Sequence, residues 1–133
     1  MIVVLDASAA VRVARDEGAE FAEILDSADL VIAPDLINAE VCSALRKYVR
    51  AKLVSEAQAA TTVHRALALV DEVYPLGDLV AEVLELTAGT TASAYDAFYL
   101  ALARRQHATF ITADNALRRT AASLSIPTCD PPR

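Results

Sequence analysis

The sequence opens with a short apolar run that stops at an acidic residue. Residues 1–5 (MIVVL) are followed by Asp6, and a helical pattern of apolar residues begins directly after this aspartate. A run that is short and apolar throughout is typical of a strand in a parallel sheet, because helices cover such a sheet on both faces. The same arrangement returns at residues 108–112 (ATFIT), which lead to Asp114. These two units indicate an α/β fold with acids at the carboxyl ends of its strands.

Strand and helix patterns alternate along the rest of the chain. Further strands are expected at residues 30–33 before Pro34, at 73–76, and as a short edge strand at Ile126 before a Pro-rich tail. Helices are expected directly after Asp6, at 19–27, as a hairpin at 35–51 and 55–70, at 78–88 with Asp78 as cap, at 93–106 with Ser93 as cap, and at 114–124. The alternation predicts a three-layer α/β/α sandwich with a mainly parallel sheet of about five strands. With 133 residues and no linker or repeat, we expect one domain over residues 1–133.

Composition narrows the class of protein. Hydrophobic residues make up 55% of the chain and aromatic residues only 5%, so Ala, Val and Leu must build the core and an apolar interface, which favours self-association. The formal net charge of −6 argues against a protein that coats nucleic acid in general. No apolar run approaches the ~18 residues that a membrane span needs, and we expect a soluble cytoplasmic protein.

Despite the negative net charge, one segment contains a cluster of basic residues. Its members are Arg46, Lys47, Arg50 and Lys52. It is either a basic edge that meets nucleic acid or a solvated helix end with cations near its C-terminus.

Cysteine and histidine give no sign of a metal or disulfide site. Cys42 and Cys129 lie far apart without a C-x-x-C pair, and we interpret them as buried or incidental thiols. His64 and His107 have no acidic or cysteine partner at a useful spacing, so we place them at the surface or at helix ends.

Four acids stand where an α/β fold places its chemistry. Asp6 and Asp114 follow strands, Glu40 lies in an apolar helix, and Asp96 heads another helix. Ligands of open parallel sheets bind outside the carboxyl ends of the strands, where acids that are distant in sequence converge. Carboxylate oxygens are the ligands that Mg²⁺ and Mn²⁺ prefer. The four acids therefore predict a site for one or two divalent ions that activates water against a phosphodiester, without a Cys, His or Ser nucleophile.

Three of these acids also have a structural interpretation. Asp6 and Asp114 each stand where a helix cap belongs, and Asp96 follows Ser93 by three residues, the position of a capping-box acid. For each of them alone, capping and catalysis are equally supported. The positions of all four acids at strand ends and in helices, taken together, favour a functional role over capping alone.

Glu40 is harder to explain by structure. It shares a helix face with apolar residues, and no Lys or Arg lies three or four positions away. An unpaired acid on an apolar face is costly unless a metal or ligand compensates its charge. Ser8 and Thr112, two positions from Asp6 and Asp114, have hydroxyls that support a carboxylate or are simply helix-start and strand-end residues.

Four segments appear in a recognisable order: residues 3–8 (VVLDAS), Pro34 with Glu40, residues 93–101 (SAYDAFYLA) and residues 111–114 (ITAD). Together they resemble a PIN-domain ribonuclease of the VapC toxin type over essentially the whole chain. The resemblance implies an endoribonuclease that depends on Mg²⁺ or Mn²⁺ and cuts structured RNA such as tRNA or ribosomal RNA.

The resemblance also implies the roles of single residues. By position, four acids match the family's quartet of catalytic and metal-binding residues, namely Asp6, Glu40, Asp96 and Asp114. Ser8 and Thr112 match its hydroxyl neighbours.

Partners are implied in the same way. A cognate VapB-like antitoxin would place a basic side chain among the acids, in the space of the metal. A homodimer would form through the helices around residues 36–68, with higher toxin–antitoxin assemblies built on it.

The same sequence features bear on three other functions. A PIN scaffold that only binds RNA or protein stays open, although an intact acidic quartet is costly without metal. A receiver-like signalling domain is disfavoured, because no acidic pair follows the first strand and no lysine follows Thr112. An aspartyl phosphatase is disfavoured because residue 8 is serine rather than a second aspartate.

Overall fold

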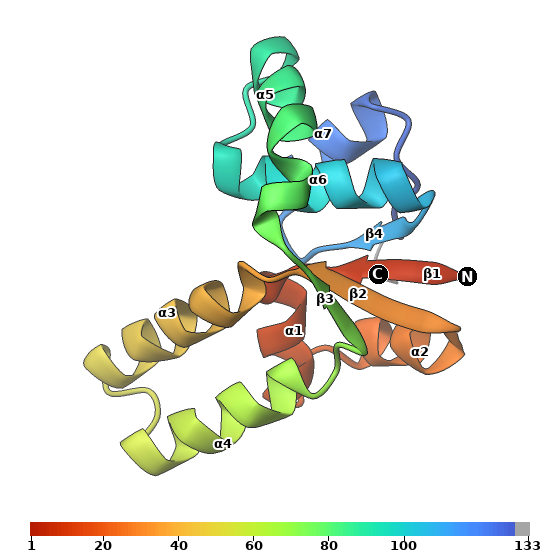
Figure 1. Cartoon of the computed structure of the whole chain (residues 1–133). Coiled ribbons are helices and arrows are strands. Elements are labelled where there is room, and N and C mark those ends of the chain that lie inside the picture. Colours follow the sequence, from red (N-terminus) through yellow and green to blue (C-terminus); the bar gives the residue numbers. More distant parts are fainter. Residues whose placement is uncertain (130–133) are drawn as a thin grey trace.

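A computed structural model describes residues 1–129 and shows a parallel sheet between two layers of helices (Figure 1). The strands are β1 (Ile2–Leu5), β2 (Leu30–Pro34), β3 (Glu72–Tyr74) and β4 (Thr109–Ile111), in the spatial order β3-β2-β1-β4. All pairs are parallel, and Val4 of β1 lies opposite Ile32 on one side and Phe110 on the other. The predicted three-layer α/β/α sandwich with a parallel sheet is confirmed.

Within residues 1–129, the sheet has four strands where about five were expected. The segment around Ile126 contributes a single bridge, between Phe110 and Thr128, and no strand. Ile126 is buried and its amide donates to the carbonyl of Ala121 in the preceding helix, so this residue closes the helix end instead of extending the sheet.

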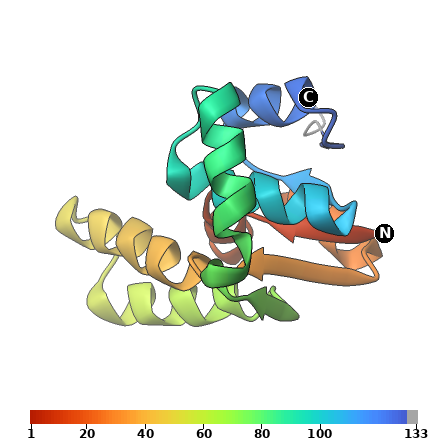
Figure 2. The same cartoon turned by 45° about the horizontal axis from the view of Figure 1, so that its top comes forward.

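One helical layer holds α1 (Ala7–Ala14), α2 (Ala19–Ser27), α3 (Ile37–Arg50) and α4 (Glu56–Leu67). The expected hairpin of α3 and α4 is present and projects beyond the edge of the sheet (Figure 1 and Figure 2). Ser55 caps α4 through a complete capping box with Gln58. The α3 helix begins at Ile37, two residues later than expected, because Asp35 and Leu36 form the turn out of β2.

The opposite layer holds the short 3-10 helix η1 (Leu76–Leu79), α5 (Val80–Gly89), α6 (Ala94–Gln106) and α7 (Asn115–Ser123). Ser93 caps α6 as expected, by accepting from the amide of Asp96. The expectation that Asp78 caps a helix is wrong: α5 begins at Val80 and has no side-chain cap. Leu79 is fully buried, and anchoring it in the core draws residues 76–79 into a tight turn that includes Asp78.

The core lies on both faces of the sheet. Strand β1 is buried along Val3, Val4 and Leu5, and small buried residues of α6, such as Ala97 and Ala101, let that helix lie close to β1, β2 and β4. This close packing brings the start of α6 to the carboxyl edge of the sheet.

A few other expectations concern single residues. Cys42 is exposed and Cys129 is half-buried, so of the two interpretations, buried or incidental thiols, burial does not apply to Cys42. His64 is exposed and His107 ends α6, as expected. Across the part of the chain that is described, no helix is both long and apolar enough to span a bilayer. Residues 130–133, the end of the expected tail and domain, lie outside the described residues.

Candidate active site

The four predicted acids meet at the carboxyl edge of the sheet. Asp6 directly follows β1, and Asp114 comes three residues after the end of β4. Glu40 lies in the first turn of α3 and Asp96 in the first turn of α6. Two parallel strands thus end where two helices begin, which is the arrangement that gathers distant side chains in α/β folds.

Asp6 is the most enclosed of the four, with 5% of its surface exposed. Its carboxylate accepts hydrogen bonds from the Ser8 hydroxyl at 2.7 Å, the Ala9 amide at 3.0 Å and the Thr112 hydroxyl. Burial raises the pKa of Asp6 to about 6, the hydrogen bonds oppose that rise, and the charge of Glu40 adds to it. Asp6 is therefore a helix cap and a perturbed acid at once.

The hydroxyls of Ser8 and Thr112 tie the ends of β1 and β4 together. They lie 3.3 Å apart, and both contact Asp6. Each also accepts from a backbone amide at 3.0 Å, Ser8 from Ala113 and Thr112 from Asp114. With their donors and acceptors engaged, these side chains fix the direction of the Asp6 carboxylate.

Glu40 and Asp96 are half-buried and continue the row of negative charges. Burial raises the pKa of Glu40, and the charge of Asp96 raises it further. Burial likewise raises the pKa of Asp96, with a second contribution from Asp114. Each acid therefore lies near enough to the next one to disfavour its charged form. Among residues 1–129, none of the four forms an ion pair with Lys or Arg.

Tyr99 is a neighbour of the site that the sequence interpretation missed. Its side chain is 98% enclosed, since 2% of its surface is exposed, and its ring packs at 6.3 Å from that of Phe110. Its hydroxyl interacts with Glu40 but has no partner in good hydrogen-bond geometry within the described residues. Burial first, and then Glu40, raise the pKa of Tyr99 well above its usual range, so the phenol stays neutral. Its position three residues after Asp96 was the available signal, because that spacing puts both on one helix face.

The donors fit a hard divalent cation by their chemistry. All are carboxylate oxygens, and a bound cation would reduce the repulsion between their negative charges. Within residues 1–129, however, no three Asp, Glu, His or Cys side chains stand close enough together to hold an ion by themselves. Mg²⁺ usually takes one or two carboxylates and keeps several waters, so such an open arrangement suits it.

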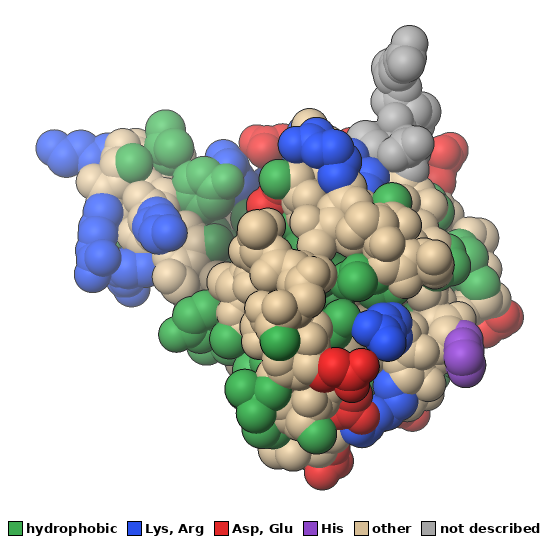
Figure 3. Space-filling view, turned by 90° about the horizontal axis from the view of Figure 1, so that it is seen from above, with side chains coloured by type: hydrophobic (Ala, Val, Ile, Leu, Met, Phe, Trp, Pro, Cys, Tyr) green, Lys and Arg blue, Asp and Glu red, His purple; other side chains and the backbone are tan. Residues whose placement is uncertain are grey.

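A groove of about 580 Å³ adjoins the acids between α1 and α3. Ser8 and Glu40 line it on the side of the acids, and Arg12 and Lys47 add positive charge. Lys47 belongs to the basic cluster noted in the sequence, whereas Arg12 was not singled out. Lys and Arg side chains gather on the projecting end of the α3–α4 hairpin (Figure 3).

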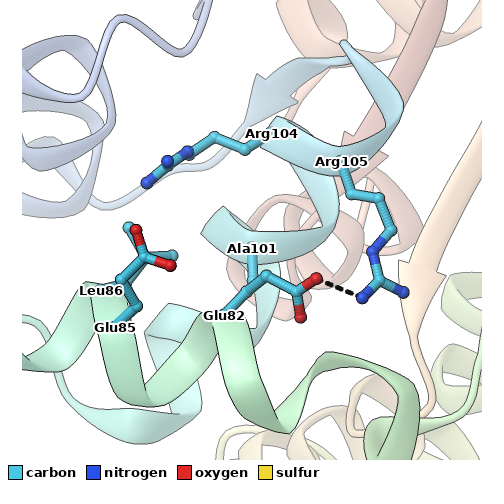
Figure 4. A pocket seen from close by; sticks show the side chains of 6 residues that line it. All are labelled: Glu82, Glu85, Leu86, Ala101, Arg104 and Arg105. Atoms are coloured by element: carbon cyan, nitrogen blue, oxygen red, sulfur yellow. Dashed lines mark hydrogen bonds and ion pairs between the residues drawn. The ribbon is translucent and has the colours of Figure 1, made fainter.

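A second pocket, of about 230 Å³, lies between α5 and α6 and has a different character (Figure 4). Here Glu82 forms an ion pair with Arg105, whose guanidinium also donates to the carbonyl of Asp78 at 2.6 Å. The charge of Glu82 is already neutralised by Arg105. The edge that holds Asp6, and not this pocket, is therefore the candidate site.

Comparisons with known proteins identify the family of this chain. The model of the PIN domain family matches residues 3–123. VapC ribonuclease Mb0985 of Mycobacterium bovis and Ribonuclease VapC9 of Mycobacterium tuberculosis are each 31% identical over 119 residues, which is 90% of this chain and 91% of each relative.

Two solved structures share the fold. PAE2754 from Pyrobaculum aerophilum has a TM-score of 0.67 at 22% identity and covers 90% of this chain and 84% of its own. VapBC-1 from nontypeable Haemophilus influenzae has a TM-score of 0.70 at 14% identity and covers 98% of both chains. At these identities the likeness concerns the fold, while the sequence relatives and the family model give the family. The chain belongs to the PIN-domain family and, within it, to the ribonuclease toxins of the VapC type.

Proposed function

We propose that this protein is an endoribonuclease dependent on Mg²⁺ or Mn²⁺, the toxin of a toxin–antitoxin pair, and that it hydrolyses phosphodiester bonds in structured RNA such as tRNA or ribosomal RNA. One observation carries the proposal. Four carboxylates form a row of like charges at the carboxyl edge of the sheet, and no Lys or Arg of residues 1–129 pairs with them. A row of this kind is costly to fold unless a cation binds it.

The proposal gives each residue a role. Asp6 and Asp96 are the principal metal ligands, and Glu40 and Asp114 complete the site or hold the attacking water. A bound divalent ion supplies positive charge to the phosphoryl oxygens and favours deprotonation of the water. Ser8 and Thr112 orient the Asp6 carboxylate through the hydrogen bonds described above. With a pKa of about 6, Asp6 is largely charged at neutral pH and available as a ligand.

A cognate antitoxin of the VapB type is the proposed partner. Solved VapBC complexes from Haemophilus influenzae and Rickettsia felis share this fold over almost the whole chain, which supports the proposal. A basic side chain of the antitoxin would inhibit by lying among the four acids, where its charge replaces that of the metal.

The proposed assembly is a homodimer through the helices of residues 36–68, from which larger toxin–antitoxin assemblies are built. Leu53, in the turn between α3 and α4, is 62% exposed and supplies apolar surface there. The proposal also places the protein in the cytoplasm, because its RNA substrates are found there.

A PIN scaffold that binds RNA or protein without cutting is the alternative. It is favoured by the lack, among the described residues, of three acids close enough to hold an ion unaided. Cleavage assays separate the two functions.

The decisive experiment is cleavage of total cellular RNA by the purified chain in Mg²⁺, Mn²⁺ or EDTA, with the products mapped. Asp96→Asn removes one charge from the row, and Asp26→Asn removes the same charge from an exposed position on α2. We expect discrete cuts that require metal, persist in Asp26→Asn and fall by about 100-fold or more in Asp96→Asn, equivalent to about 2.7 kcal/mol of transition-state stabilisation. Equal cleavage by both variants, or none by a folded parent free of antitoxin, would favour the binding-only alternative.

A further inference from the structure

Positive charge is concentrated in one part of this acidic protein. Residues 37–67, which form α3, α4 and their connection, contain five Lys or Arg and two Asp or Glu, a formal charge of +3 in a chain of net −6. The rest of the chain therefore carries −9. A negatively charged polymer approaching this molecule is attracted to the hairpin and repelled elsewhere.

Several of the cations near the hairpin are already engaged. Arg46 pairs with Glu56 at 2.6 Å, and Arg65 pairs with Asp16 at 3.2 Å. Arg12 and Lys47 differ from these. Both are exposed, and neither takes part in an ion pair or side-chain hydrogen bond within the described part of the chain. Their charges are available to a ligand.

Arg12 and Lys47 both line the groove beside the acids, whereas Arg50 and Lys52, which also form no ion pair within residues 1–129, do not line it. Arg12 follows Ser8 by one helical turn on α1, about 6 Å along the axis. Lys47 follows Glu40 by two turns on α3, about 10 Å along the axis, with Ala44 between them on the same face. On each wall of the groove, the polar residue at the sheet edge is thus followed by a cation further out.

We propose that Arg12 and Lys47 bind backbone phosphates of an RNA strand that lies in the α1–α3 groove and leads to the acids. This assignment rests on the proposed ribonuclease function and adds the position of the substrate. The row of carboxylates repels a polyanion, so a site that cuts one requires positive charge close beside it. The apolar lining between the cations, Val11 and Ala44, faces the less polar parts of the strand.

Salt dependence of binding tests the proposal, because each lost phosphate contact to a single strand lowers the slope of log K against log salt by about 0.7. The probe is fluorescein-labelled oligouridylate, and its anisotropy is measured with the full chain in EDTA over a series of NaCl concentrations. The double variant Arg12→Gln/Lys47→Gln removes both groove cations. The control Arg104→Gln/Arg119→Gln removes two exposed arginines of α6 and α7 that also lack ion pairs in residues 1–129.

We expect the groove variant to lower the slope by about 1.4 and the control to leave it unchanged. In cleavage with Mg²⁺, the groove variant should raise KM several-fold with little change in kcat. Equal slopes in the two double variants, no salt-dependent binding by the parent, or displacement of the probe by polyglutamate at equal charge concentration would overturn the proposal. Polyglutamate displacement would assign the groove to an acidic protein.

These outcomes are separate from the failure of the nuclease function. If the parent protein cuts RNA and the groove variant has the same KM, the ribonuclease function stands and RNA binding in the groove is refuted. If the parent binds with a steep salt dependence that the groove variant loses, but never cuts RNA, binding in the groove stands and the ribonuclease function is refuted.

Discussion

Two clusters of acids in this molecule have opposite electrostatics. Between α5 and α6, Glu82 meets the guanidinium of Arg105, whose hydrogen bond lowers the pKa of Glu82 (Figure 4). At the carboxyl edge of the sheet, Asp6, Glu40 and Asp96 have raised pKa values, because burial and neighbouring acids disfavour their charge. The titrating groups are carboxylates in both places, but Glu82 has a cation as its neighbour, whereas the acids at the sheet edge have other acids as neighbours.

The pairing of Glu82 with Arg105 links α5 to α6, whereas the acids at the sheet edge have no cationic partner among residues 1–129. In the pair between α5 and α6, each charge has its counter-charge in the chain. The row at the sheet edge costs stability in the metal-free protein, and a bound cation would relieve that cost. Three experiments test this contrast.

The largest expected effect is on the stability of the metal-free protein. Because the pKa of Asp6 is raised from 3.8 to about 6, the folded state holds its proton more tightly than the unfolded state does. Stability from this group is therefore full below about pH 4 and is lost as the pH rises to about 6, by about 3 kcal/mol in total. Asp6→Asn should remove much of this decline and stabilise the chain at pH 7, as measured by urea unfolding in EDTA.

Glu82→Gln is the matched control for that experiment. The pKa of Glu82 is lowered, so its charged form favours folding above its unfolded pKa, and loss of the charge should not stabilise the chain at pH 7. If both variants stabilise the protein equally, the contrast between the two clusters is wrong.

The next effect is metal binding. Mg²⁺ or Mn²⁺ at 100 times its dissociation constant should stabilise the folded chain by about 2.7 kcal/mol, since it binds the native state alone. Differential scanning fluorimetry with and without EDTA measures the shift in Tm. Asp96→Asn should lose most of it and Glu82→Gln should keep it. An equal shift in both variants would place the ion away from the row of acids.

The smallest expected effect concerns Tyr99. Its hydroxyl lowers the pKa of Glu40, so Tyr99→Phe should raise that pKa further and weaken Mg²⁺ binding a few-fold near pH 6, with a smaller effect near pH 8. Folding should change little, because the hydroxyl has no partner of good geometry in the described residues. Titration calorimetry at the two pH values measures the difference.

Tyr95→Phe removes the same hydroxyl from a side chain that is 64% exposed, next to Asp96, and serves as the control. If metal affinity changes equally in both variants, or at both pH values alike, Tyr99 has no specific effect on Glu40.

Most of the fold followed from local patterns. Helix α2 was expected at residues 19–27 and found at Ala19–Ser27, because Gly18 and the helical apolar spacing mark its limits in the chain itself. Strand β1 was found one residue shorter than expected. The errors occur where burial overrides a local signal, as when Leu79 takes Asp78 into a turn, or when Ile126 packs into the end of α7.

Some residues of the candidate site could be predicted from the sequence, and others could not. Asp6 and Asp114 were visible because each follows a strand, and Glu40 because no Lys or Arg lies three or four positions away from it on its apolar helix face. Arg12 and Tyr99 were not singled out. Arg12 matters through the groove that α1 forms with α3, which has no signature in nearby sequence. Tyr99 follows Asp96 by three positions, but its place beside Glu40 depends on how α6 packs against the sheet.

The parallel α/β architecture and the order of the acids can be inferred from the sequence, since strand and helix periodicity and residue type are properties of short segments. Which charges have partners depends on the tertiary structure. Glu82 lies 23 positions from Arg105 and is neutralised by it, whereas Asp6 lies among other acids and the hydroxyls of Ser8 and Thr112. Coulomb interactions depend on distance in space and on burial, and both are fixed when the helices pack on the sheet.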